Sequence, residues 1–124
     1  ELSLTAASKQ KSWEEVKEMS RHGISFGSHT NSHPVLSVIS EKEAQIEIAG
    51  SKKVIEEQTQ KLVNTFAYPY GKVQDYNRDY IFKILKNEGF KYACSTNKGS
   101  EEFPLENPLE LKRKGVSAYP YLFL

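Results

Sequence analysis

Apolar residues recur every three or four positions in three stretches of the chain, and residues that start or stop helices bound these stretches. The first stretch begins at Ser12, which forms a capping-box pattern with Glu15, and it ends before Gly23. This pattern predicts a short helix that Gly23 closes. Its apolar face consists of Trp13, Val16 and Met19.

The second stretch begins with another capping box, Ser40 and Glu43, and predicts a long helix to about Leu62. Its apolar stripe consists of Ala44, Ile48, Ile55 and Leu62. The third stretch predicts a helix over roughly residues 77–88, and Gly89 follows its end. Its inward positions are Tyr80, Ile81, Ile84 and Leu85.

Strands are predicted between and after these helices, at residues 24–28, 65–68, 90–95 and 111–117. Alternation of strands and helices predicts an α/β fold with a parallel sheet and right-handed crossovers. In parallel α/β folds the active site lies at the carboxyl ends of the strands. Two polar segments, residues 28–34 and 69–71, follow predicted strands and are therefore the candidate site segments.

Composition limits the classes of function. A chain of 124 residues is long enough for one domain and too short for two. With 17 basic and 16 acidic residues the net charge is +1, so we expect neither nucleic acid nor an anionic membrane as a partner. The single cysteine, Cys94, excludes an intrachain disulfide and a zinc site built on cysteine pairs. No apolar run approaches the length of a transmembrane helix.

His29 and His33 are the main chemical signal. Two histidines at positions i and i+4 of one helical turn lie on one face, where both rings reach the same metal ion. Neutral imidazole suits zinc, iron, cobalt or nickel. The alternative is a pair of surface-loop histidines. We expect the other candidates, His22 and Asp75, to act at helix ends, as a cation at a C-terminus and as an N-cap.

The second signal is the segment Tyr68-Pro69-Tyr70-Gly71. Proline fixes the backbone and glycine permits an unusual φ, so the segment can present a rigid backbone N–H and an aromatic wall to a sugar ring. The alternative is an ordinary turn with buried tyrosines.

The two segments together resemble the NodB-like polysaccharide deacetylases. The resemblance is carried by residues 27–34 and 66–71, and it extends over residues 12–117. Further matches lie in the long helix and the later strands, at Glu47, Ser51, Lys52, Lys53, residues 89–93 and residues 111–113. The Phe-Ala-Tyr-Pro-Tyr-Gly form is most similar to deacetylases that act on exported poly-N-acetylglucosamine.

The resemblance implies a partial distorted (β/α) barrel and a metal-dependent hydrolase that removes N-acetyl groups from a cell-surface polysaccharide. It makes His29 and His33 ligands of a divalent metal, usually zinc, with cobalt or nickel as other options. It assigns the backbone N–H of Tyr70 to the oxyanion site. Pro69 would hold that amide in place, and Tyr68 would line the sugar groove, so that residues 68–70 bind substrate. The protein is then expected outside the cell or in the cell envelope.

Two departures from the family pattern affect the expected activity. The family's early Thr-Phe-Asp-Asp run supplies its general base and third metal ligand, and its late Leu-x-His supplies the general acid; the chain has neither. We therefore expect residues 1–124 to be a single deacetylase domain truncated at the N-terminus, and also at the C-terminus, and inactive alone. The alternatives are a non-catalytic sugar- or metal-binding α/β module and a plain interaction domain.

A barrel without its first strand leaves an open sheet edge. Residues 2–5 alternate like an edge strand, and residues 119–124 are strongly apolar. We therefore expect a homo-oligomer joined through the sheet edge or by exchange of a terminal segment.

Overall fold

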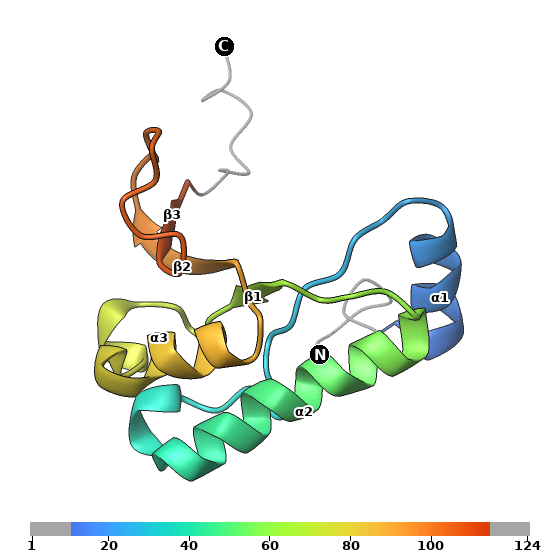
Figure 1. Cartoon of the computed structure of the whole chain (residues 1–124), viewed down its shortest axis with the longest axis horizontal. Helices are drawn as coiled ribbons and strands as arrows, with labels where there is room; N and C mark the ends of the chain where they lie inside the picture. The colour runs from blue at the N-terminus through green and yellow to red at the C-terminus, as the bar shows by residue number, and fades with distance from the viewer. Residues whose placement is uncertain (1–10, 115–124) are drawn as a thin grey trace, which may run out of the picture.

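The computed structural model describes residues 11–114, as three helices, three strands and two short 3-10 turns (Figure 1). The helices are α1 (Trp13–Arg21), α2 (Glu41–Thr59) and α3 (Arg78–Asn87). The strands are β1 (Thr65–Ala67), β2 (Tyr92–Lys98) and β3 (Leu111–Arg113). The 3-10 turns are η2 (Leu36–Val38) and η3 (Val73–Asp75).

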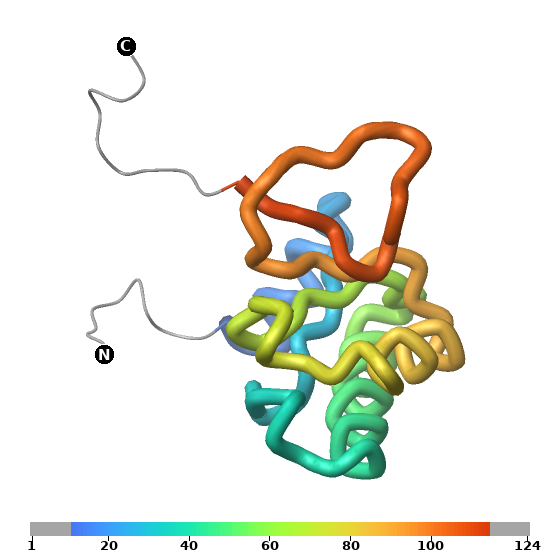
Figure 2. Tube along the Cα trace, turned by 90° about the vertical axis from the view of Figure 1, so that its left-hand side faces the viewer, coloured from blue at the N-terminus to red at the C-terminus, as the bar shows by residue number. Residues whose placement is uncertain are grey.

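The three strands form a parallel sheet in the order β1-β2-β3. Thr65 pairs with Tyr92 and Ala67 with Cys94, and α3 makes the crossover between these two strands. The long connection between β2 and β3 forms a wide loop on the far side of the sheet strands from α2 (Figure 2). The parallel α/β architecture predicted from the alternation of elements is thus confirmed, as an open sheet.

The predicted strand at residues 24–28 is wrong except at its last residue. Ser28 forms one parallel bridge with Phe66: its N–H donates to the Thr65 carbonyl, and its own carbonyl accepts from the Ala67 N–H. Because β1 is only three residues long, the Thr65 carbonyl and the Ala67 N–H are the two backbone groups with which it pairs this neighbour. Gly27 sits so close to β1 that an added Cβ would lie 2.5 Å from Thr65 Oγ1.

The other strand boundaries also shift. β2 begins two residues later than predicted and continues to Lys98. β3 covers Leu111–Arg113, and the prediction to residue 117 runs beyond the described residues. The termini on which the assembly prediction rests, residues 2–5 and 119–124, also lie outside the described part of the chain.

Both predicted capping boxes are present, at Ser12 with Glu15 and at Ser40 with Glu43. α2 ends at Thr59 rather than at Leu62, because Gln60 adopts a left-handed conformation with φ 58°. The chain turns there, and Leu62 is 87% exposed instead of completing the apolar stripe.

α2 and α3 lie together beside the sheet and cover one of its faces (Figure 1). Burial alternates along the strands: Phe66 and Ala93 are buried, whereas Thr65 and Cys94 are exposed. The core between the helices and the sheet includes Ala44, Ile48, Phe66, Ile81, Ile84, Leu85, Phe90 and Ala93. Within residues 11–114 no helix is both long and apolar enough to cross a bilayer.

Candidate functional site

The two segments predicted as site segments converge beside the carboxyl end of β1. The polar loop of residues 28–34, here called the histidine loop, begins at the bridge between Ser28 and β1. The turn of residues 69–71 follows β1 directly. The His33 ring lies 4.7 Å from the His29 ring and 4.8 Å from the Tyr70 ring, centroid to centroid, in edge-to-face arrangements.

His29 is oriented by the strand beside it. Its Nδ1 lies 2.7 Å from the Ala67 carbonyl oxygen, and a carbonyl can only accept, so Nδ1 carries the proton. Nε2 is then the unprotonated nitrogen of the neutral ring. A second-shell bond of this kind fixes the tautomer and orientation of metal-binding histidines. Both histidines are exposed, and the described residues contain no group of three side chains able to hold a metal.

The histidines come together through loop geometry, not through the helical turn predicted from their spacing. Thr30 and His33 have φ values of 68° and 58°, which place both in the left-handed region. Pro34 disfavours the right-handed helical conformation at His33, which is the physical reason the helical prediction fails. Each left-handed non-glycine residue costs about 1–3 kcal/mol and persists only where its surroundings impose it. Thr30 Oγ1 helps by accepting a 3.1 Å bond from the His33 N–H.

Tyr68 lies in the core rather than at a surface. Its side chain is 1% exposed, its hydroxyl donates to the Leu109 carbonyl at 2.6 Å, and its ring stacks on Tyr76 at 4.0 Å. Pro69 is also fully buried. This corrects the expectation that the Tyr68 side chain lines a sugar groove. Its ring belongs to the core, as the alternative of an ordinary turn with buried tyrosines predicts for Tyr68 but not for the exposed Tyr70, and Tyr68 and Pro69 anchor the turn from inside.

Tyr70 is the member of this turn that faces solvent, with 55% of its surface exposed. Its φ is 62°, and its carbonyl accepts a 2.9 Å bond from Thr96 Oγ1. Its N–H has no acceptor among residues 11–114. Gly71 follows with φ 86°, packed against Thr96 so closely that a Cβ would meet the Thr96 nitrogen at 2.9 Å. The turn therefore leaves one backbone donor available next to the histidine pair.

Glu47 of α2 holds the tip of the histidine loop, and the sequence-based site did not include it. Its Oε2 accepts the N–H groups of Asn31 and Ser32 at 2.8 and 2.9 Å, and its Oε1 accepts the Ser32 hydroxyl at 2.5 Å. Partial burial acts to raise the pKa of Glu47, but the bonds from Ser32 and Asn31 outweigh it and lower the pKa. The available signal was its place one turn before Gly50 and Ser51 in the long helix.

Small residues of α2 let the histidine loop approach. At Gly50 an added Cβ would lie 2.5 Å from Asn31 Nδ2, so the Asn31 side chain occupies the space that glycine leaves. At the next residue of α2, the buried hydroxyl of Ser51 is hydrogen-bonded to that of Ser28. The loop is thus attached to α2 at its start and at its tip.

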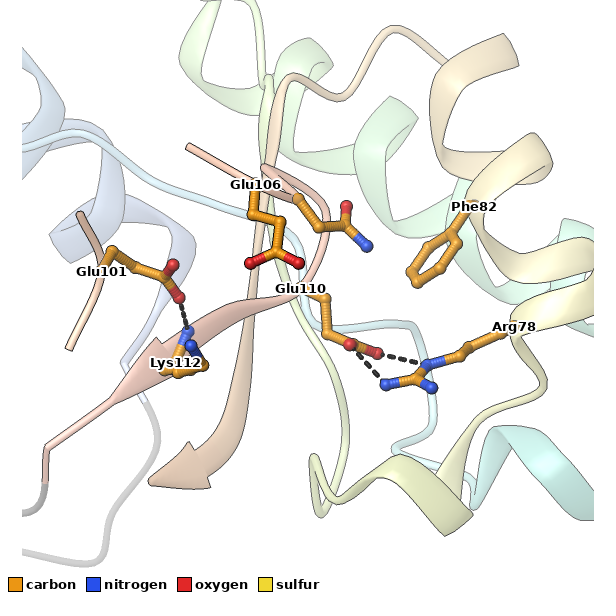
Figure 3. Close-up of a pocket in the computed structure, with 7 residues that line it drawn as sticks. Arg78, Phe82, Glu101, Glu106, Glu110 and Lys112 are labelled. Atoms are coloured by element: carbon orange, nitrogen blue, oxygen red, sulfur yellow. Dashed lines mark hydrogen bonds and ion pairs between the residues drawn. The ribbon is translucent and has the colours of Figure 1, made fainter. Parts of the chain in front are cut away.

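A hollow of about 430 Å³ lies elsewhere, between α3 and the segment leading into β3 (Figure 3). Arg78 donates to both carboxylate oxygens of Glu110, at 2.8 and 2.6 Å, and Tyr76 donates to the same carboxylate at 2.8 Å. Since Tyr76 stacks on Tyr68, the residue two before Tyr70, this network supports the Tyr70 turn through the core. The hollow contains none of the predicted site residues, so it carries no part of the proposed chemistry.

The two helix-end predictions have different outcomes. His22 is at the C-cap of α1, where its Nδ1 contacts the Glu18 carbonyl at 2.9 Å, as predicted. Asp75 does not cap α3: its carboxylate accepts the Lys72 N–H at 2.9 Å within η3, and Asn77 is the cap of α3. Asp75 lies two residues before Asn77, which is too early to cap α3.

Known proteins with similar sequences are described as polysaccharide deacetylases. A family model with that description matches residues 3–93. The chain is 32% identical over 87 residues to YxkH of Bacillus subtilis strain 168, a protein whose name describes it as a polysaccharide deacetylase. That match covers 70% of this chain and 30% of YxkH.

Solved structures show the same fold. The deacetylase PplD of Streptococcus pyogenes, solved with acetate, matches with a TM-score of 0.76 and 27% identity over 87% of this chain and 46% of PplD. The polysaccharide deacetylase BC0361 of Bacillus cereus matches with a TM-score of 0.70 and 31% identity, over 88% of this chain and 33% of its own. IcaB from Ammonifex degensii, at 24% identity, matches in fold with a TM-score of 0.76 over 89% and 49%. The chain thus spans less than half the length of these relatives.

Proposed function

The chain belongs to the polysaccharide deacetylase family, and from this membership we propose that it serves a hydrolase that removes N-acetyl groups from a cell-surface polysaccharide. The observation that carries the proposal is the convergence of His29, His33 and the Tyr70 turn at the end of β1. We further propose an acetylated polysaccharide as its partner and the cell envelope or exterior as its location.

His29 and His33 are the residues that would hold a divalent metal such as zinc. Their fit to a metal is supported by the protonated Nδ1 of His29, which leaves Nε2 as a donor, and by the close approach of the two rings. A metal bound there supplies Lewis-acid polarisation of the acetyl carbonyl and an activated water. We propose zinc because imidazole nitrogen is among its preferred ligands.

The turn after β1 would serve the same acetyl group. The Tyr70 N–H has no acceptor among the described residues, so it is free to donate to the acetyl oxygen as negative charge develops there. Such a donor is effective only if it is fixed beforehand. The buried Tyr68 and Pro69, and the bond from Thr96 to the Tyr70 carbonyl, hold this amide in one orientation.

A non-catalytic metal- or sugar-binding module is the second candidate. It is favoured by one observation: within residues 11–114 no carboxylate joins the two histidines to complete a set of three donors. Such a module would still bind metal through His29 and His33. It would not hydrolyse an acetyl group, since no general base stands with the pair in the described part of the chain.

Zinc titration by calorimetry tests the site itself. We expect one zinc ion to bind per chain, weakly because only two protein ligands are identified, and binding to be lost in His33→Ala. His22→Ala is the matched control, since His22 is also exposed but lies at the end of α1. Equal zinc binding by the wild type and His33→Ala would refute the site.

Acetate release from an N-acetylglucosamine oligomer with added zinc tests the deacetylase directly. Release that disappears in His33→Ala supports the deacetylase and refutes the non-catalytic module. Absence of release does not favour the module, because the chain contains neither the Asp-Asp run nor the late Leu-x-His that supply the family's general base and acid.

A further inference from the structure

We propose that Glu47 is a positioning residue that holds the histidine loop in the shape that brings His29 and His33 together. This inference rests on the proposed metal-binding function of the two histidines. No hydrogen bond joins Glu47 to either ring; it acts on the loop through the backbone N–H groups of Asn31 and Ser32 and the Ser32 hydroxyl.

The contacts of Glu47 are placed where the loop needs them. The two left-handed residues, Thr30 and His33, lie on either side of Asn31 and Ser32, the pair that Glu47 binds. Both N–H groups of this pair donate to Oε2 of Glu47, and the Ser32 hydroxyl donates to Oε1. A carboxylate that binds two successive N–H groups fixes the peptide plane between them. Glu47 therefore imposes the backbone conformation that the loop would not adopt unaided.

Packing alone does not hold this part of the loop. A hollow of about 210 Å³ lies beside it, lined by Ser32, Pro34, Ile39, Glu43, Ile46 and Glu47. Asn31, Ser32 and His33 are themselves exposed. Hydrogen bonds to α2 thus replace the side-chain contacts that usually determine a loop conformation.

The chemistry of the contact predicts which substitutions it tolerates. In Glu47→Gln the amide oxygen can occupy the Oε2 position and accept both N–H groups. The amide NH2 then faces the Ser32 hydroxyl, which can rotate and accept. Glu47→Ala removes all three bonds. Glu57→Ala is the matched control, because Glu57 is an exposed glutamate of the same helix, ten residues further along.

The first measurement is hydrogen exchange of the Asn31 and Ser32 amides in the metal-free chain, read by NMR. We expect exchange to be at least tenfold faster in Glu47→Ala, and to stay within about threefold of the wild type in Glu47→Gln and Glu57→Ala. The second is zinc affinity by calorimetry, which we expect to fall about tenfold or more in Glu47→Ala, the scale seen when a second-shell partner is lost. Far-UV circular dichroism confirms that each variant is folded.

The outcomes separate the two levels of the proposal. Glu47→Ala with wild-type amide exchange, or with wild-type zinc affinity, would overturn the positioning role. Rescue by Glu47→Gln supports it, since a merely electrostatic role would be lost with the charge. If neither the wild type nor any variant binds zinc, the proposed metal site fails, and with it the claim that Glu47 serves metal binding.

Discussion

Replacing Glu110 with glutamine tests the network that supports the Tyr70 turn through Tyr76 and Tyr68. Oε2 of Glu110 accepts from Arg78 Nε and the Tyr76 hydroxyl, and Oε1 accepts from Arg78 Nη2 at 2.6 Å. A glutamine oxygen at the Oε2 position leaves an NH2 facing the guanidinium. Because a guanidinium has no acceptor, this pair of donors cannot rearrange as the Ser32 hydroxyl can.

The expected loss of stability follows from these contacts. A hydrogen bond to a charged group contributes about 1.5–3 kcal/mol. The Arg78 side chain is 50% exposed, so water compensates part of the loss, whereas the Glu110 side chain is only 13% exposed. We therefore expect Glu110→Gln to lower the free energy of unfolding by about 2 kcal/mol and the melting temperature by roughly 6–12 °C.

The difference should also depend on pH in a defined direction. Burial acts to raise the pKa of Glu110, but the bonds from Arg78 and Tyr76 outweigh it and lower the pKa below the ordinary 4.5. A carboxyl with a lowered pKa stabilises the fold above its unfolded pKa, and this stability is lost as the pH falls through the folded value. The gap between wild type and Glu110→Gln should thus be full near neutrality and shrink below 4.5.

Urea unfolding at several pH values measures both effects. Glu106→Gln is the matched control, since Glu106 lines the same hollow but is exposed. If the two variants lose the same stability, or if the loss for Glu110→Gln does not change with pH, the network does not stabilise the fold in this way.

Two further predictions concern the turn after β1 and the sheet edge. Gly71→Ala should destabilise the protein more than Gly89→Ala. Both residues have positive φ, where a side chain costs about 1–2 kcal/mol, but only at Gly71 would the added Cβ also clash with Thr96. If urea unfolding shows the same loss of free energy of unfolding for both variants, close packing at Gly71 does not contribute. β3 is paired on one side only within residues 11–114, so we expect light scattering to report a dimer or larger species. A monomer at every concentration would contradict that expectation.

Local signals in the sequence predicted the helices well. Both capping boxes and the parallel order of the strands follow from short-range patterns that the structure confirms. The strand at residues 24–28 failed because its pairing depends on β1, about 40 residues later, which offers it a single bridge at Ser28. The predicted end of α2 was wrong because no glycine marks the true end; Gln60 adopts the left-handed conformation there.

The candidate site was predictable in identity more than in geometry. The spacing of His29 and His33 marked the pair, but their proximity comes from two left-handed residues in a loop. The sequence did not decide whether Tyr68 is buried, because an aromatic ring suits both a core and a sugar groove. Glu47 was not recognised as a site residue because its role depends on tertiary contacts with the loop, 15 and 16 residues before it.

The attachment of the histidine loop to α2 also bears on how the protein opens. The loop is bonded to α2 through Glu47 and through the hydroxyls of Ser28 and Ser51, whereas it meets β1 by the bridge at Ser28 and the bond from His29 to Ala67. Ala44 and Ile48 of α2 share one core with Phe66 of β1 and Ile81 of α3. The histidine loop is therefore fastened to two elements of the same core. Separating His29 from the Tyr70 turn requires loss of the loop's own hydrogen bonds or an opening of that core.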